Sequence, residues 1–388
     1  MLFVRTNKLK KGMRLARPIY NKDGVLLYER NSKLTLQGIQ SIKAFGLLGL
    51  FILEPAEPVP PMTQEDILFE RFQTMTVFAL REELNRIKTD EKKSPKLQVI
   101  VNNIQRRYGH LDKKINFIQN LRSKEDYVYK HALNVAILSA MITHGLHMSV
   151  EEQAEVVIAA LLHEIGKLSI PKDIMEKDDP SEAELEMIST YELTGHELIG
   201  KVLPNSPNIR RICVQAHKAM ETLQTGGTVE RNRLLQGAKV LMVAEAYDKM
   251  TAMRLEHAPE SEVTAIRYLL HHQDVFETDI IDALIRSVNI LIPGVSVELN
   301  TGEKAIVIKN NPRNVLRPRV LCFKNNNIID LGEKEYDDIK IMDIMKTMDN
   351  RYILDTKTLR DNGIFVPEPE EAEMQKGIEE TDDEETEG

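Results

Sequence analysis

The feature that most constrains the fold is a long stretch, from residue 63 to about 291, in which the pattern of apolar residues is helical almost throughout. Thr63-Gln64-Glu65-Asp66 resembles the start of a helix, and a Ser-x-x-Glu capping box over 149–152 precedes an apolar run. The stretch is long enough to bury a hydrophobic core of its own. We therefore predict a mainly α protein built around a helical bundle.

The sequences on either side of the helical stretch predict β-strands. The N-terminal side has a turn signal at Asn21-Lys22-Asp23-Gly24 between apolar segments, followed by a short helix from about residue 35 to 45. After Pro293-Gly294, apolar segments with strand patterning recur at 295–299, 305–308, 319–323 and 328–331. The predicted organisation is a small β-rich unit over 1–53, a proline-rich linker over 54–62, the helical domain over 63–291, a β-rich segment over 292–366 and a tail over 367–388.

The acidity of the chain is concentrated in the tail. The net charge is −9, and residues 367–388 contain eleven Asp and Glu residues against one lysine, Lys376. Such a segment buries too little apolar surface to offset the entropy of ordering, so we expect it to be disordered. It would act as a solubilising extension or as an arm that contacts signalling partners. The rest of the chain is nearly neutral and lacks the concentrated basic face that DNA binding needs.

The composition also indicates where the protein is found. The longest apolar run, over 44–53, is about half of the roughly 20 residues that a membrane span requires. The first residues place lysine and arginine where a secretory signal needs its apolar stretch. Cys213 and Cys322 lie far apart, without metal-binding spacing. We predict a cytoplasmic protein without a membrane span.

The most informative local run is Ala-Ala-Leu-Leu-His163-Glu164-Ile-Gly166-Lys167. An apolar helix places an imidazole and a carboxylate in its last turn, and Gly166 ends the helix. Consecutive helical residues point about 100° apart, so His163 and Glu164 can reach two sides of one ion, while Lys167 can face an anionic oxygen. The alternative is a partly buried histidine near a helix end beside a solvent-facing glutamate.

Two further residues sharpen this signal. His131 opens an apolar helical run, and Glu245 is set within another, where an ionised carboxylate is costly unless it has a partner. Two histidines and two carboxylates are suitable ligands for a divalent first-row metal. Asp248 shares the helix face of Glu245 and can either orient a ligand or make a structural hydrogen bond.

The motifs around these residues resemble the HD superfamily of metal-dependent phosphohydrolases. They are HALNVA from His131, HEIGKLSIP from His163 and AKVLMVAEAYDKMTAMR around Glu245, and they match the skeleton H…HD…D. The segments before and after the core are also similar to those that accompany the HD-GYP family, which hydrolyses cyclic di-GMP. The resemblance implies an HD-type helical bundle flanked by the small β-rich units.

The resemblance also implies roles for individual residues. The family's first histidine falls on His131, its HD pair on His163 and Glu164, and its distal aspartate on Glu245. Lys167 takes the place of the catalytic-loop lysine. In the family these positions hold iron or manganese ions that activate water against a phosphodiester. The predicted catalytic residues are accordingly Lys167, His163 and Glu164, and the predicted metal ligands are His131, His163, Glu164, His217 and Glu245.

Several positions depart from the family pattern. Both skeletal acids are glutamate, and the GYP element is replaced by Leu-Gln-Thr-Gly-Gly over 223–227. A family histidine is replaced by Tyr191, and of a histidine pair only His217 remains, between Ala216 and Lys218. The losses fall on the second and third metal positions, so we expect one divalent ion, iron or manganese, rather than two or three.

Two functions follow from the resemblance. The first is a cyclic-dinucleotide phosphodiesterase in second-messenger signalling, with cyclic di-GMP as substrate. The second is a catalytically inactive HD-GYP-like protein that acts as a nucleotide sensor or as an interaction module. The altered acids and the missing GYP element favour the second function, and the retained His131, His163 and Lys167 favour the first. A purely structural scaffold would leave Glu245 without a partner.

Overall fold

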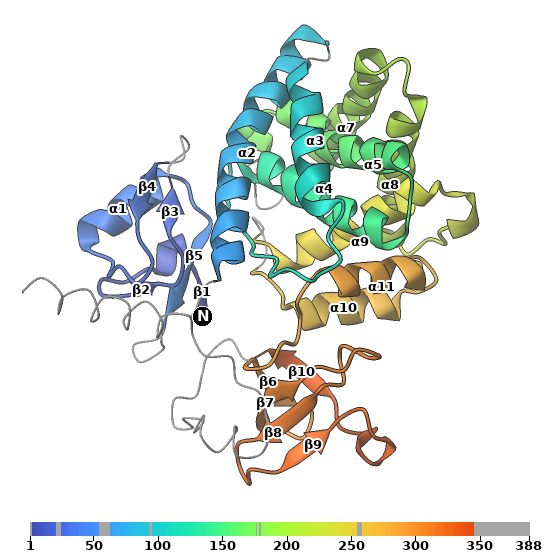
Figure 1. Ribbon diagram of the computed structural model, residues 1–388. Helices are drawn as coiled ribbons and strands as arrows, with labels where there is room; N and C mark the ends of the chain where they lie inside the picture. The colour runs from blue at the N-terminus through green and yellow to red at the C-terminus, as the bar shows by residue number, and fades with distance from the viewer. Residues whose placement is uncertain are drawn as a thin grey trace, which may run out of the picture.

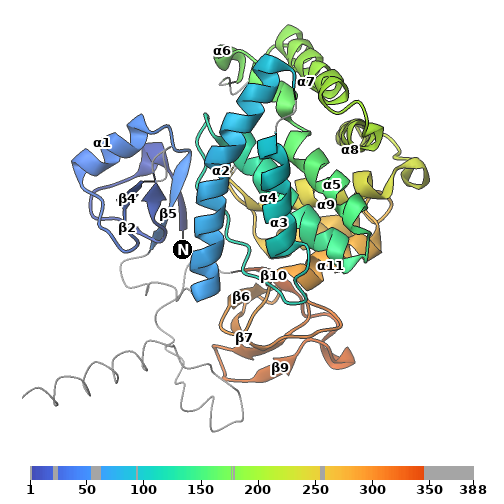
Figure 2. The same cartoon turned by 45° about the horizontal axis from the view of Figure 1, so that its top comes forward.

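The computed structural model describes residues 2–20, 25–53, 63–92, 95–175, 177, 180–253 and 258–344. The helices form one central body, with a small β-rich unit beside α2 and a β-sheet near α10 (Figures 1 and 2). This arrangement confirms the predicted fold class, a mainly α protein with β-rich units on either side. Within the described ranges, no helix is both long and apolar enough to cross a membrane.

The N-terminal unit has its own hydrophobic core, which includes Leu15, Ile42 and Leu50. The predicted short helix is present, and the Thr35 side chain caps it by accepting a hydrogen bond from the backbone N–H of Gly38. The predicted turn over 21–24 and the linker over 54–62 lie outside the described residues. The elements are β1(Leu2–Arg5), η1(Thr6–Lys8), β2(Arg14–Leu15), β3(Ile19–Tyr20), β4(Leu26–Tyr28), α1(Leu36–Ala44) and β5(Gly49–Leu53), with antiparallel sheets β1-β5-β2 and β3-β4.

The helical body is organised around α4, which is apolar on all sides and is covered by α2, α5, α9 and α11. Both predicted helix starts are confirmed, since Thr63 with Asp66 and Ser149 with Glu152 form capping boxes. The helices are α2(Gln64–Asp90), α3(Pro95–Tyr108), α4(Tyr127–Gly145), α5(Val150–Leu162), η2(Ile165–Ser169), α6(Lys172–Met175), α7(Glu182–Val202), α8(Pro207–Gln224), η3(Arg231–Arg233), α9(Gln236–Thr251), α10(Glu262–His271) and α11(Thr278–Ser287).

One internal segment departs from the helical pattern. Residues 109–126, between α3 and α4, contain no regular helix. This segment places Gln119 and Arg122 against α9, where both side chains are buried. The segment therefore contacts Asp248 on α9 through both side chains.

The C-terminal sheet is antiparallel, and it contains strands at all four predicted segments. The strands are β6(Ser296–Leu299), β7(Lys304–Lys309), β8(Arg319–Cys322), β9(Ile328–Asp330) and β10(Ile341–Ile344), in the order β10-β6-β7-β8-β9, with η4(Lys334–Tyr336) before β10. The sequence analysis did not identify β10, which packs against α10. The rest of the predicted β-rich segment and the acidic tail lie outside the described residues.

Candidate metal centre

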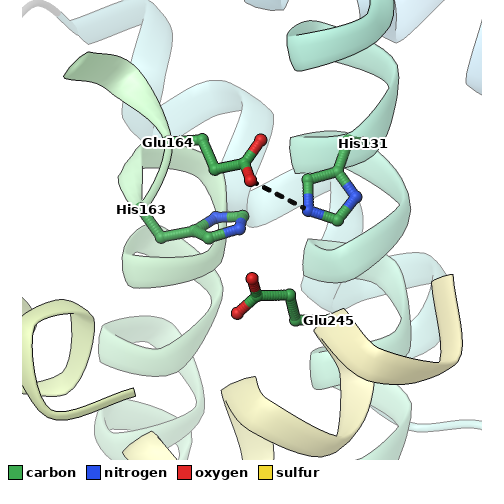
Figure 3. A group of neighbouring side chains, drawn as sticks. All are labelled: His131, His163, Glu164 and Glu245. Carbon is green, nitrogen blue, oxygen red and sulfur yellow. Dashed lines mark ion pairs between the residues drawn. The ribbon is translucent and has the colours of Figure 1, made fainter. Parts of the chain in front are cut away.

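Three elements bring the four residues of the predicted skeleton to one point. His131 lies on α4, Glu245 on α9, and His163 and Glu164 at the junction of α5 and η2 (Figure 3). One ligand atom from each residue lies within 4.8 Å of the others, and three of the four residues are buried. This spatial convergence is the arrangement that the motif spacing led us to expect.

The end of α5 determines how the central pair is presented. The helix ends at Leu162, so His163 is its C-cap and Glu164 is the N-cap of the 3₁₀ turn, slightly beyond the last turn in which we expected them. The turn packs closely on α7, because a Cβ atom at Gly195 would lie 2.6 Å from the Cα of Gly166. The missing side chains at these two glycines allow η2 to approach α7 and to hold Glu164 and Lys167 at the cavity wall.

Both histidines direct Nε2 at the common point. The Nδ1 atom of His131 lies 2.6 Å from a carboxylate oxygen of Asp248, and Nδ1 of His163 lies 2.8 Å from the carbonyl oxygen of Ala160. Since these oxygens accept, each ring donates its Nδ1–H, and the tautomer that does so in the neutral form carries its lone pair on Nε2. Burial lowers the pKa of His163 to about 4, which favours the neutral form.

Three buried atoms at the common point have no hydrogen-bond partner among the described residues. They are Nε2 of His131, Nε2 of His163 and Oε2 of Glu164. Leaving a polar atom buried without a partner costs roughly 1–3 kcal/mol. Two imidazole lone pairs and a carboxylate oxygen are the donors that a divalent first-row metal accepts. The residues therefore fit a metal ion.

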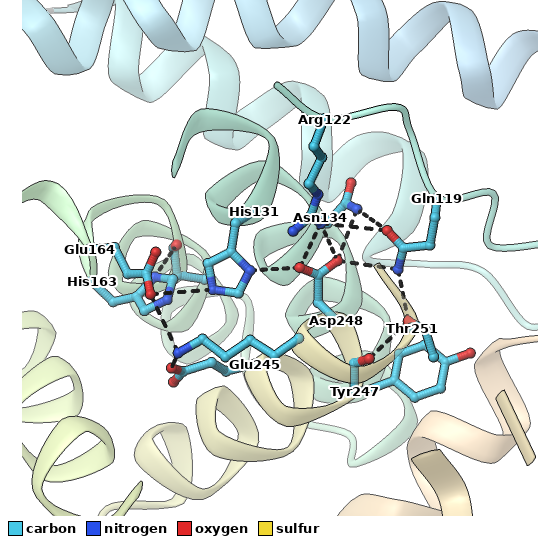
Figure 4. Close-up of polar contacts among 12 residues, drawn as sticks. Gln119, Arg122, His131, Asn134, His163, Glu164, Glu245, Tyr247, Asp248 and Thr251 are labelled. Carbon is cyan, nitrogen blue, oxygen red and sulfur yellow. Dashed lines mark hydrogen bonds and ion pairs between the residues drawn. The ribbon is translucent and has the colours of Figure 1, made fainter. Parts of the chain in front are cut away.

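A second layer of buried polar groups fixes His131 (Figure 4). The carboxylate of Asp248 accepts from Arg122, with both N–O distances at 2.7 Å, and from Asn134 at 2.9 Å. Burial alone would raise the pKa of Asp248, but the Arg122 charge and the His131 hydrogen bond hold it well below its ordinary value. A carboxylate that orients a histidine in this way is the usual outer partner of a metal ligand.

Part of this layer was missed by the sequence analysis. Asp248 was identified as a candidate for orienting a ligand, and it contacts His131. Gln119 and Arg122 were not identified, because they belong to the non-helical segment and contact Asp248 across more than 120 residues of sequence. Asn134 had a detectable signal, since it is a single amide within the apolar run of α4.

Two lysines contact the carboxylates of the cluster. The Nζ atom of Lys167 lies 2.5 Å from Oε1 of Glu164, and its predicted role toward a phosphate oxygen stays a prediction. Lys249, which the sequence analysis did not identify, contacts Oε1 of Glu245 and lies 3.4 Å from Oε1 of Glu164. Burial would raise the pKa of Glu245, but the ammonium of Lys249 lowers it to about 2.

His217 lies apart from the other predicted ligands. Its Nε2 atom is 3.9 Å from Glu192, and its ring packs 5.2 Å from that of His196. It belongs to the wall of a cavity of about 490 Å³ that also includes His163, Glu164 and Glu245. Within the described part of the chain, the group around His131 is the one cluster of potential ligands.

A larger cavity of about 620 Å³ lies between the N-terminal unit and α2. The described residues that line this cavity include Arg17, Glu70 and Gln73 but no histidine. Of these two cavities, the smaller one is therefore the one with histidines in its described lining.

Comparisons with known proteins agree with this geometry. A model of the family "HD domain" matches residues 116–280. The chain is 23% identical over 221 residues to the cyclic di-GMP phosphodiesterase PA4108 of Pseudomonas aeruginosa, covering 55% of this chain and 53% of that protein. It is 25% identical over 227 residues to the cyclic di-GMP phosphodiesterase PdeB of Borreliella burgdorferi, covering 57% of this chain and 59% of that protein.

The chain spans somewhat more than half the length of these two relatives. The solved structure of Bd1817, an HDG"Y"P protein from Bdellovibrio bacteriovorus, matches with a TM-score of 0.43 and 15% identity over 73% of this chain and 97% of that chain. The matched family model covers α4, α5 and α9, which carry the four clustered residues. Residues 116–280 therefore match the HD domain family, and the chain is similar to two proteins that are named cyclic di-GMP phosphodiesterases.

Proposed function

We propose that this protein is a metal-dependent phosphodiesterase that acts on a cyclic dinucleotide, with cyclic di-GMP as the first candidate. The observation that carries the proposal is the convergence of three unpartnered buried atoms, from His131, His163 and Glu164, beside a cavity. The two relatives named above are cyclic di-GMP phosphodiesterases. The volume of about 490 Å³ is within the range of small-molecule sites.

The residues of the cluster would have different roles in such a site. His131, His163, Glu164 and Glu245 would hold the ion, for which we propose iron or manganese. When bound, the ion supplies an activated water and polarises a phosphoryl oxygen. Asp248 keeps His131 in the tautomer that leaves Nε2 unprotonated.

The cavity wall supplies the groups that would contact the nucleotide. Lys167 would face a phosphate oxygen as a point charge, which stabilises the negative charge that develops during the displacement. His217 lies on the same wall, and we propose that it contacts phosphate rather than the ion held by His131.

A sensor without turnover is the second candidate. The observation that favours it is that the described residues form one group of potential ligands, whereas clamping both oxygens of an in-line displacement uses two metal ions. In this version the cavity binds the nucleotide and other proteins detect the complex. The cytoplasmic location and a partner for the acidic tail stay predictions.

Metal content and turnover separate these candidates. We would purify the full chain with manganese or iron, measure the bound metal, and assay cyclic di-GMP and a generic phosphodiester. His163→Ala should lose the metal and reduce turnover at least 100-fold, while the control His271→Ala, on the exposed end of α10, should change neither. Metal and nucleotide binding without turnover by the unmodified protein would instead support the sensor.

A further inference from the structure

The proposed function leaves one group at the centre of the cluster without a role, the ammonium of Lys249. Lys249 follows Glu245 by four residues on α9, so the two side chains lie on the same face of the helix. Its Nζ atom contacts Oε1 of Glu245 and lies 3.4 Å from Oε1 of Glu164. The ammonium therefore joins carboxylates that belong to two different elements of the site.

Two lysines offset the charges of the two carboxylates of the cluster, and Lys167 also lies 3.6 Å from Glu192. The carboxylates of Glu164 and Glu245 face the ammonium groups of Lys167 and Lys249, and these lysine side chains are only 21% and 23% exposed. The ammonium groups of both lysines lie near Oε1 of Glu164, while Oε2 has no hydrogen-bond partner among the described residues. Each carboxylate thus already has a cation at one of its oxygens.

A divalent ion at this point would have to share these carboxylates with an existing positive charge. Lys249 cannot move far, because its backbone lies on a helix that packs against α4, α5 and α8. Its side chain can turn toward the cavity, whose wall it forms. Pairing with Lys249 and binding of a metal ion are therefore alternative arrangements of these carboxylates.

We propose that Lys249 is a tethered cation that competes with the divalent ion for the carboxylates of Glu164 and Glu245, so that it stabilises the metal-free site and weakens metal binding. This inference rests on the proposed metal site, but it concerns the affinity of that site for the metal ion. The protein would hold metal only when the free ion is abundant enough to displace the ammonium.

A titration of the full chain with Mn²⁺ tests this competition. In Lys249→Met the dissociation constant should fall at least tenfold, because a positive charge is removed from the carboxylates that hold the ion. Lys249→Arg keeps the charge and should stay within about threefold of the unmodified protein. The matched control is Lys239→Met, at another lysine of α9, which removes an ion pair of 2.6 Å with Glu277 before α11 and should leave the constant within about twofold.

Thermal unfolding in a chelator gives a second readout. Lys249→Met should unfold at a lower temperature than the unmodified protein, because Glu164 and Glu245 lose a shared cation, and Mn²⁺ should raise its midpoint by more than it raises that of the unmodified protein. If Lys249→Met does not fold without metal, Lys249→Gln serves for both measurements, since its amide can still donate to the carboxylates.

The outcomes distinguish this inference from the proposed function. Equal Mn²⁺ affinity of Lys249→Met and Lys239→Met overturns the competition, whether or not the protein hydrolyses a nucleotide. Tight binding by Lys249→Met, together with no measurable binding by the unmodified protein, supports the competition and contradicts the proposed metal enzyme. If neither protein binds Mn²⁺, both ideas are overturned.

Discussion

The two histidines of the cluster are held in different ways, and the difference separates two sides of the site. His131 is fully buried and donates to a carboxylate that is itself held by Arg122 and Asn134. His163 donates to a backbone carbonyl of its own helix and lines the open cavity. The side toward the interior is a closed polar network, which we call the Asp248 network, and the other side faces the cavity. In the proposed function, the first side would fix the geometry of the metal ligands and the second would receive the substrate.

The largest effect is expected from breaking the Asp248 network. Arg122→Met removes the guanidinium that contacts the fully buried carboxylate of Asp248, so the free energy of unfolding should fall by about 3–5 kcal/mol. Denaturant titration measures this loss. Lys113→Met, which removes an exposed ion pair with Glu65, should cost at most about 1 kcal/mol. A loss in Arg122→Met no larger than this control would show that the network does not stabilise the fold.

A milder change to the same network should weaken the binding of the metal ion. Asp248→Asn keeps the shape of the side chain but no longer presents a charged acceptor to His131, so the affinity for Mn²⁺ should fall about 10–100-fold. Calorimetric titration measures the constant. Asp330→Asn, which changes an ion pair with Arg319 in the C-terminal sheet, should leave the affinity unchanged. Unaltered binding in both variants would mean that His131 needs no outer partner.

Acid should destabilise the cavity side through His196. Burial lowers the pKa of this ring to about 4, so between pH 7 and 5 the unfolded chain binds a proton that the folded chain does not. Its contribution to stability is present above pH 6.5 and declines as the pH falls, by about 2 kcal/mol at pH 5.

Replacement of this ring isolates its effect from that of other histidines. Unfolding of His196→Gln, compared with the unmodified protein at both pH values in a chelator, should show a pH dependence smaller by about that amount. His163 acts in the same direction but is present in both proteins. An identical pH dependence in the two proteins would contradict this assignment.

The smallest effect sharpens the comparison between the two sides. His217→Gln changes a residue of the cavity wall that lies outside the cluster of four, so Mn²⁺ affinity should stay within about twofold. Affinity for cyclic di-GMP should fall about threefold to tenfold, which corresponds to about 0.7–1.4 kcal/mol. A large loss of metal binding would place His217 among the ligands.

The parts of the site that follow from local pattern were predictable from the sequence. The helix starts at Thr63 and Ser149 are set by residues three positions apart, and the four clustered residues lie in short recognisable runs. Arg122 was not predictable, because its partner Asp248 is 126 residues away and its own segment has no helical period. Lys249 was overlooked for a different reason. A glutamate and a lysine four residues apart on a helix are normally a solvent-exposed pair, and only the packing of α9 buries this one.

The contact between Gly166 and Gly195 has a consequence for which ligands the cavity can accept. A Cβ atom at Gly166 would lie 2.9 Å from the Cα of Glu192, and one at Gly195 would lie 2.5 Å from the amide nitrogen of Gly166. Main chain meets main chain here, with no side chain between them that can change rotamer. The backbone at this contact is therefore rigid, and ligands of different size must be accommodated by the longer side chains of α8 that line the cavity.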